Sequence, residues 1–177
     1  MKKLIAALAL FVGLNVNAGI ISIETSDTNV DIGETVTVNL NATGFGDFDF
    51  FDFDFDFNTS IFSYDASTLM TDLDPFAGFF VVSETANGMA LSFGDILIFG
   101  GDFLLASFDL IAQSAGVATF SMGDALFGDI FGDDLNIDIS ATQSVEVSTP
   151  IVQVSTPATL GIFAIAAFAF AGFRRKA

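Results

Sequence analysis

The 177-residue sequence contains no cysteine and no histidine, and no lysine or arginine occurs between Leu4 and Phe173. Without cysteine the chain cannot form a disulfide, whatever compartment it occupies. Zinc sites built from His and Cys are excluded, and so is nucleophilic catalysis that depends on either residue. Because this interval has no base, Schiff-base chemistry on lysine and charged phosphate clamps are excluded as well.

The same interval holds all 22 Asp and Glu of the chain, so its charge has a single sign. A domain with this charge repels phosphate, and we expect no nucleic-acid partner. A glycosidase with paired carboxylates is the one enzyme class that these absences leave open. Because carboxylates are abundant throughout the chain, finding two of them at a suitable distance would not indicate a glycosidase site. We therefore predict that the protein is not an enzyme.

The five basic residues lie in two clusters at the ends of the chain, each beside an apolar run. Leu4–Leu14 follows the first cluster, and Ala158–Phe173 precedes the second. The clusters are Lys2 and Lys3 at the start, and Arg174, Arg175 and Lys176 at the end. Positive charge beside a short hydrophobic segment is what the export machinery and the membrane potential use to orient that segment.

The N-terminal segment has the features of a secretory signal peptide. A basic start, an apolar run of about ten residues and Val16-Asn17-Ala18 at its exit follow the usual order. We therefore predict a signal peptide over 1–18, cleaved between Ala18 and Gly19. The alternative is a first helix of the folded domain, but the run has no amphipathic face.

The C-terminal segment is predicted to reach the membrane. Polar residues 148–157 form a linker, and 16 uncharged residues, Ala158–Phe173, precede the basic end. As a helix they would extend roughly 24 Å, slightly less than a hydrocarbon core of about 30 Å. We predict that 158–177 is a marginal transmembrane helix, with Arg174, Arg175 and Lys176 as a membrane-stop cluster on the cytoplasmic side. A buried C-terminal core helix is the alternative.

Val154–Leu160, the following apolar run and the terminal Arg-Arg-Lys resemble the PEP-CTERM sorting signal of Gram-negative bacteria. Ser155, Thr156 and Pro157 stand where that family has Pro-Glu-Pro, so only the final proline is kept. The resemblance implies cleavage near this motif by an exosortase-type membrane protease. It also implies export through the inner membrane, transient anchoring by the helix, and release to the cell surface or the extracellular matrix.

Residues 19–147 are predicted to form one all-β domain. Short runs of β-type residues separated by turn residues are typical of an antiparallel sandwich. Gly-Asp pairs, among them Gly94-Asp95 and Gly123-Asp124, lie between the runs and predict turns there. Asp65–Asp74 is predicted as a turn or a single helical turn. With 23 phenylalanines in the chain, core material is ample.

Phe51–Phe57 is the most distinctive segment, because Phe and Asp alternate strictly along it. As a strand it places four phenyl rings on one face and Asp52, Asp54 and Asp56 on the other. Such carboxylates stand about 7 Å apart and repel by about 0.6 kcal/mol per pair in water. Nothing basic in the domain can neutralise them, so we predict an acidic binding face that takes cations or a basic partner.

The alternation changes phase at Phe50 and Phe51, which are adjacent. A one-residue β-bulge there would return all the phenylalanines to the core, whereas a continuous strand would expose Phe48 and Phe50. We predict the bulge.

Three patches of the body resemble the cohesin family. Phe51–Tyr64 is similar to the family stretch F-D-F-D-L-x-F-D-P-x-x-L-x-F, with Asn58-Thr59 in place of Asp-Pro. Val30–Val38 resembles the family opening V-x-V-G-D-x-F-x-V, and Leu104–Ser121 resembles a later pair of strands. The patches occur in the family's order and cover most of residues 20–140.

The resemblance implies a jelly-roll β-sandwich of about nine strands, flanked here by the signal helix and the C-terminal helix. Its best-known members bind a calcium-loaded dockerin module through one sheet face. The resemblance therefore implies a non-enzymatic binding or scaffolding module. Its partner is expected to be a dockerin-like or other secreted protein, or an extracellular polysaccharide. The alternatives are a calcium- or salt-dependent structural matrix protein and a permanently anchored single-pass protein.

The acidic loop 123–134 is the predicted calcium site, since turn carboxylates and carbonyls can converge on a hard cation. The alternative is an acidic surface loop without a metal. Asp52, Asp54 and Asp56 have the spacing with which an EF-hand loop begins, but Phe57 occupies the position that requires glycine, so that match is false. The calcium candidates are Asp124, Asp129, Asp133 and Asp134.

Overall fold

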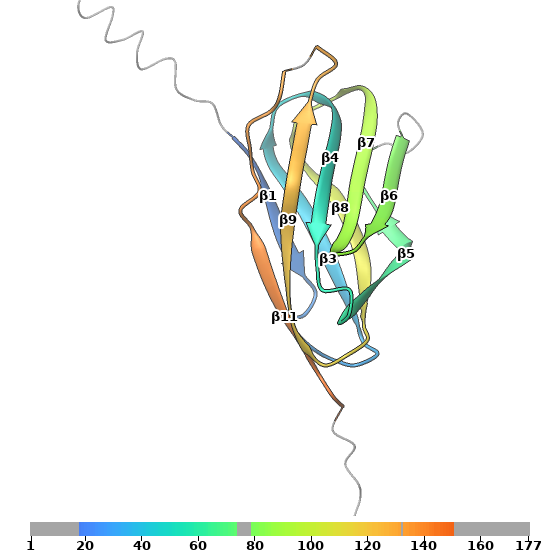
Figure 1. The fold of residues 1–177 in the computed structure, drawn as a ribbon. Helices are drawn as coiled ribbons and strands as arrows, with labels where there is room; N and C mark the ends of the chain where they lie inside the picture. The colour runs from blue at the N-terminus through green and yellow to red at the C-terminus, as the bar shows by residue number, and fades with distance from the viewer. Residues whose placement is uncertain (1–17, 74–78, 132, 151–177) are drawn as a thin grey trace, which may run out of the picture.

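The computed structural model describes residues 18–73, 79–131 and 133–150, which form an all-β fold (Figure 1). The strands are β1 (Gly19–Thr25), β2 (Asn29–Asp31), β3 (Thr35–Phe45), β4 (Phe48–Asp56), β5 (Phe62–Met70), β6 (Phe79–Thr85), β7 (Gly88–Ile98), β8 (Gly101–Ala112), β9 (Gly116–Gly128), β10 (Ile137–Asp138) and β11 (Thr142–Ser148). One sheet has the order β10-β1-β3-β8-β5 and the other has the order β2-β11-β9-β4-β7-β6. The two sheets pack face to face as a sandwich.

The core lies between the sheets and is built largely from phenylalanine. On β4, Phe51, Phe53 and Phe55 are at most 1% exposed, as the alternation of Phe and Asp predicts. Phe55 meets Phe108 of β8, in the opposite sheet, edge to face, with the ring centroids 5.2 Å apart. Aromatic pairs of this kind stabilise a core beyond the area they bury. The alternation thus determines which face of β4 enters the core and leaves the aspartates outside.

The structure has an irregularity close to the predicted β-bulge, but its extra residues are on β7 and not on β4. The register shifts between Phe48 and Phe50, which pair with Ile98 and Gly94, so the single residue Asp49 lies opposite three residues of β7. Phe48 enters the core at 1% exposure, whereas Phe50 is only half-buried and lies opposite Gly94 and Gly128. The expectation that every phenylalanine returns to the core is therefore wrong for Phe50. The ring of Phe50 lies outside the core. The two glycines opposite have no side chains and leave room for it, so the ring is partly covered there.

Three predicted turns are strand in the structure. Gly94-Asp95 lies inside β7, and Gly123-Asp124 lies inside β9. In β9 the pair coincides with a register shift against β4, which is a local bulge and not a reversal of the chain. Asp65–Asp74 is mostly strand as well, because β5 continues to Met70. In each place the strand continues past an irregularity: Asp95, Gly123-Asp124 and 66–69 lie in register shifts and have no partner across the sheet there.

The described residues hold eleven strands, where about nine were expected, because two short segments pair in parallel at the edges. β2 pairs with β11, and β10 pairs with β1. The predicted signal helix and transmembrane helix fall in 1–17 and 151–177, which lie outside the described residues. Within the part that is described, no helix is long and apolar enough to cross a membrane.

Candidate functional site

Asp52, Asp54 and Asp56 form a row on the outer face of β4, which is an inner strand of its sheet. The three alternate with buried phenylalanines, so the same periodicity that builds the core presents all three carboxylates to one side. Asp52 is exposed, and Asp54 and Asp56 are partly covered. We call this set the carboxylate row.

Most residues beside the carboxylate row are small, but Leu126 of β9, which is 44% exposed, lies opposite Asp52. On β7, the residues opposite the three aspartates are Ser92, Ala90 and Gly88. On the other side, Gly123 of β9 lies so close that a Cβ built on it would be 3.0 Å from the Cβ of Asp54 and 3.1 Å from Oδ2 of Asp56. The row is thus bordered by short side chains along β7 and by Gly123 on β9, which leaves its outer side open. A partner can therefore approach the row from directly above.

Other acidic side chains of the domain stabilise the fold by accepting hydrogen bonds from the backbone. Asp49, which lies opposite the extra residues of β7, is 7% exposed, and its two carboxylate oxygens accept the N–H groups of Leu97 (2.7 Å) and Ile130 (2.9 Å). A buried carboxylate is tolerated when backbone donors satisfy it in this way. Asp49 joins the end of β7 to the loop after β9. Sequence reasoning missed this role, although the phase change at Phe50 marked the position where a side chain would be redirected.

The conformation of the acidic loop after β9 is held by the carboxylate of one of its own residues, Asp129. Asp129 Oδ1 accepts the N–H groups of Phe131 (2.8 Å) and Asp133 (3.1 Å), as in an Asx turn. Asp134 bridges back to Gly128, while Asp124 lies apart on β9. In the described ranges no three His, Cys, Asp or Glu side chains are grouped so that they could hold a metal ion. The calcium site stays a prediction without geometric support.

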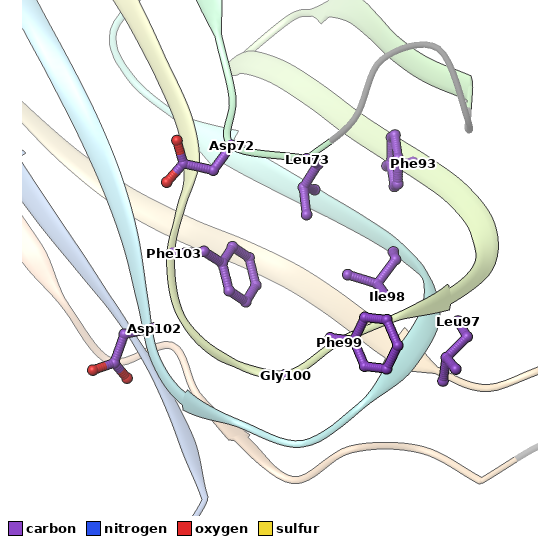
Figure 2. A pocket seen from close by; sticks show the side chains of 9 residues that line it. All are labelled: Asp72, Leu73, Phe93, Leu97, Ile98, Phe99, Gly100, Asp102 and Phe103. Carbon is purple, nitrogen blue, oxygen red and sulfur yellow. The ribbon is translucent and has the colours of Figure 1, made fainter.

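A cavity of about 300 Å³ lies at the end of the sandwich where β7 passes into β8 (Figure 2). Its apolar side chains include Phe99, 75% exposed, and Leu97, which has a left-handed φ of 63°. The two acids on its rim are engaged with the backbone: Asp72 accepts the N–H of Leu104, and Asp102 that of Gly44. Figure 2 shows both carboxylates directed away from the apolar centre. The cavity therefore offers no free catalytic pair.

The predicted processing sites lie at or beyond the ends of the described chain. Gly19 is the first residue of β1, donates its N–H to the carbonyl oxygen of Asn136 (3.2 Å), and packs beneath the ring of Phe45. The sorting motif and the membrane-stop cluster fall outside the described residues. Cleavage after Ala18 and the sorting of the tail remain predictions. The residues outside are Ser155, Thr156, Pro157, Arg174, Arg175 and Lys176.

No protein-family model matches the sequence, and no curated protein matches it either. Among solved structures, 53 chains match. A cohesin module of a family 33 glycoside hydrolase from Clostridium perfringens has a TM-score of 0.61 at 16% identity, covering 75% of this chain and 98% of its own. A non-cellulosomal cohesin from the archaeon Archaeoglobus fulgidus has a TM-score of 0.59 at 11% identity, covering 73% and 91%.

A third match is the third cohesin of ScaC from Acetivibrio cellulolyticus, solved in complex with the ScaB dockerin. It has a TM-score of 0.60 at 14% identity and covers 73% of this chain and 98% of its own. At such identities the likeness concerns the fold. The described residues of this chain form an all-β, two-sheet sandwich that resembles the cohesin modules.

Proposed function

We propose that this protein is a non-enzymatic binding module whose carboxylate row binds a basic surface of a secreted protein. The observation that carries the proposal is the row itself, with Asp52, Asp54 and Asp56 on one sheet face beside the small residues of β7. No residue between Leu4 and Phe173 can neutralise it from within the chain. The cohesin-like fold supports the proposal, since one solved cohesin of this shape is in complex with a dockerin.

The partner's chemistry follows from the charge. Complementary charges across an interface raise the association rate and exclude partners of the wrong sign. A dockerin-like or other secreted protein with several lysines or arginines on one face fits the row. A neutral polysaccharide would gain little from it, so polysaccharide binding is the weaker form of the proposal.

We expect the triple variant Asp52→Asn, Asp54→Asn, Asp56→Asn to retain at most about a fifth of the wild-type affinity for captured secreted proteins, because each lost contact costs about 0.3–1 kcal/mol. The measurement is a pull-down from secreted proteins and exopolysaccharide of the same cells, followed by affinity determination for the captured protein. The matched control is Glu24→Gln, Asp27→Asn, Glu146→Gln, which removes three exposed charges elsewhere. Equal loss in both variants, or capture of polysaccharide alone, contradicts the proposal.

We further propose that the chain is exported, held briefly by its C-terminal segment and then released. The intact mass of the exported protein is expected to lack residues 1–18 and the basic end Arg174–Lys176. A protein freed in this way has 22 acidic side chains and no basic ones, because all five bases are in the removed segments. A measured mass that accounts for Arg174–Lys176 would instead indicate a permanently anchored single-pass protein. A measured mass that accounts for residues 1–18 would contradict the predicted cleavage of a signal peptide.

A further inference from the structure

The sandwich has an open edge between β5 and β6, and a cleft lies in it. β5 is the last strand of one sheet and β6 is the last strand of the other, so the two face each other without pairing. Figure 1 shows both at the same side of the molecule. The cleft measures about 180 Å³, and its lining includes Phe57, Phe62, Tyr64 and Glu84. We call it the Tyr64 cleft.

The walls of the Tyr64 cleft are held in place by the turn between β6 and β7. Asn87 in this turn accepts the N–H of Phe57 through its carbonyl oxygen (2.8 Å). Thr59 donates its hydroxyl to the carbonyl oxygen of Ala86 (3.2 Å). These contacts fasten the end of β6, which carries Glu84, to the segment that follows β4. The cleft is thus bounded by positioned side chains before any ligand arrives.

The cleft has an apolar floor and a charged rim. Phe57 is 5% exposed and offers part of its ring to the cleft, while Phe62 is fully buried beneath the lining. Tyr64 packs edge to face on Phe108, with centroids 5.9 Å apart and an interplanar angle of 85°. Glu84 is exposed on the rim. A carboxylate beside aromatic rings is the combination that recognises an organic cation, which needs both a counter-charge and a ring face.

The field inside the cleft is negative. The pKa of the Tyr64 hydroxyl is raised above its usual value, first by burial and then by the negative charges of Asp65 and Glu84. No base between Leu4 and Phe173 offsets them. An anion is therefore repelled from the cleft, and a neutral apolar group leaves Glu84 without a counter-charge. A cation on an aliphatic stem satisfies the rim and the floor together.

We infer that the Tyr64 cleft binds an alkylammonium group, with the ammonium beside Glu84 and the ring of Tyr64 and the stem against Phe57. Such a group could come from a lysine side chain of another protein or from a free amine. The volume of about 180 Å³ suits a single side chain or a small amine and is below the range of drug-sized ligands. The carboxylate row takes no part, so the inference does not depend on the proposed function.

The sequence provides a specific reporter, because Tyr64 is the only tyrosine and there is no tryptophan. Butylammonium chloride, added to the purified protein at constant ionic strength, is expected to change tyrosine emission saturably. It should also shift the amide signals of Thr59, Tyr64 and Thr85 in NMR spectra. Butyrate and butanol have the same stem without the positive charge and should do neither. Nα-acetyl-lysine N-methylamide distinguishes the sources: if it binds as well as butylammonium, a lysine side chain fits, and if it does not, the ligand is a free amine.

Glu84→Gln is expected to weaken butylammonium binding about fivefold, in line with the modest strength of a partly exposed ion pair. Glu146→Gln on β11, at the far side of the same sheet, removes the same charge and should leave binding unchanged. Thermal melts of both variants establish that each is folded. The inference is overturned if butanol shifts the same signals as strongly as butylammonium does. Equal weakening by the two variants overturns it too, since this would reflect net charge alone.

Discussion

Phe53→Ala is expected to lower the free energy of unfolding by about 3–5 kcal/mol, the usual cost of truncating a buried phenylalanine. Phe53 is 0% exposed and packs against the rings of Phe51 and Phe127, with ring-centroid distances of 5.4 Å and 6.1 Å. Removing its ring leaves a cavity that neighbours on β4 and β9 cannot fill, because both are held by ladder hydrogen bonds.

The matched control is Phe131→Ala, which removes the same ring from a loop position that is 86% exposed. Its effect should stay within about 0.5 kcal/mol. Urea denaturation measures both variants, with the wild-type slope retained so that the midpoints can be compared. Similar losses in the two variants would mean that the alternating rings of β4 do not form the core.

Gly88→Ala is expected to cost about 2–5 kcal/mol, the sum of backbone strain and overpacking. Gly88 begins β7 with φ of 154°, and a Cβ there would stand 2.1 Å from the carbonyl oxygen of Phe55 and 3.0 Å from the nitrogen of Phe57. Both contacts are with backbone, so neither can give way easily. The turn that closes the Tyr64 cleft should loosen together with the fold.

Gly94→Ala on the same strand is the control. The nearest atom to its added Cβ would be the Cβ of Phe50 at 4.0 Å, an ordinary contact, and its φ is not positive. We expect a change within about 1 kcal/mol, since Gly to Ala in an extended strand is tolerated where space exists. Thermal or urea unfolding of the pair checks the prediction, and an equally stable Gly88→Ala variant would contradict the close approach of β7 to β4.

The carboxylate row was predictable because it depends on one strand alone. Period-two alternation places Asp52, Asp54 and Asp56 on one face wherever the strand lies in the fold. Their short neighbours on β7 and β9 were not predictable, because cross-strand register joins segments that are distant in the chain. The same limit explains Gly94-Asp95 and Gly123-Asp124, which lie at register shifts within β7 and β9 and not at reversals of the chain.

Asp49 shows what local alternation cannot predict. The phase change beside Phe50 indicated an irregular position, yet nothing local indicated that the extra residues would lie on β7 or which groups Asp49 would meet. The donors are Leu97 and Ile130, 48 and 81 residues away along the chain. Their arrival at Asp49 requires β7 and β9 to flank β4. A buried carboxylate with two backbone donors is therefore a property of the assembled sheet.

The sequence by itself determined the all-β class, the face of β4 that enters the core and the single sign of the surface charge. These depend on composition and on side-chain alternation, which are local properties of the chain. Only the tertiary structure decided which Gly-Asp pairs reverse the chain, where the bulge lies, and that Tyr64 and Glu84 border one cleft. Those two residues are on edge strands of different sheets. They border one cleft because the two sheets pack together, and no local sequence pattern predicts that packing.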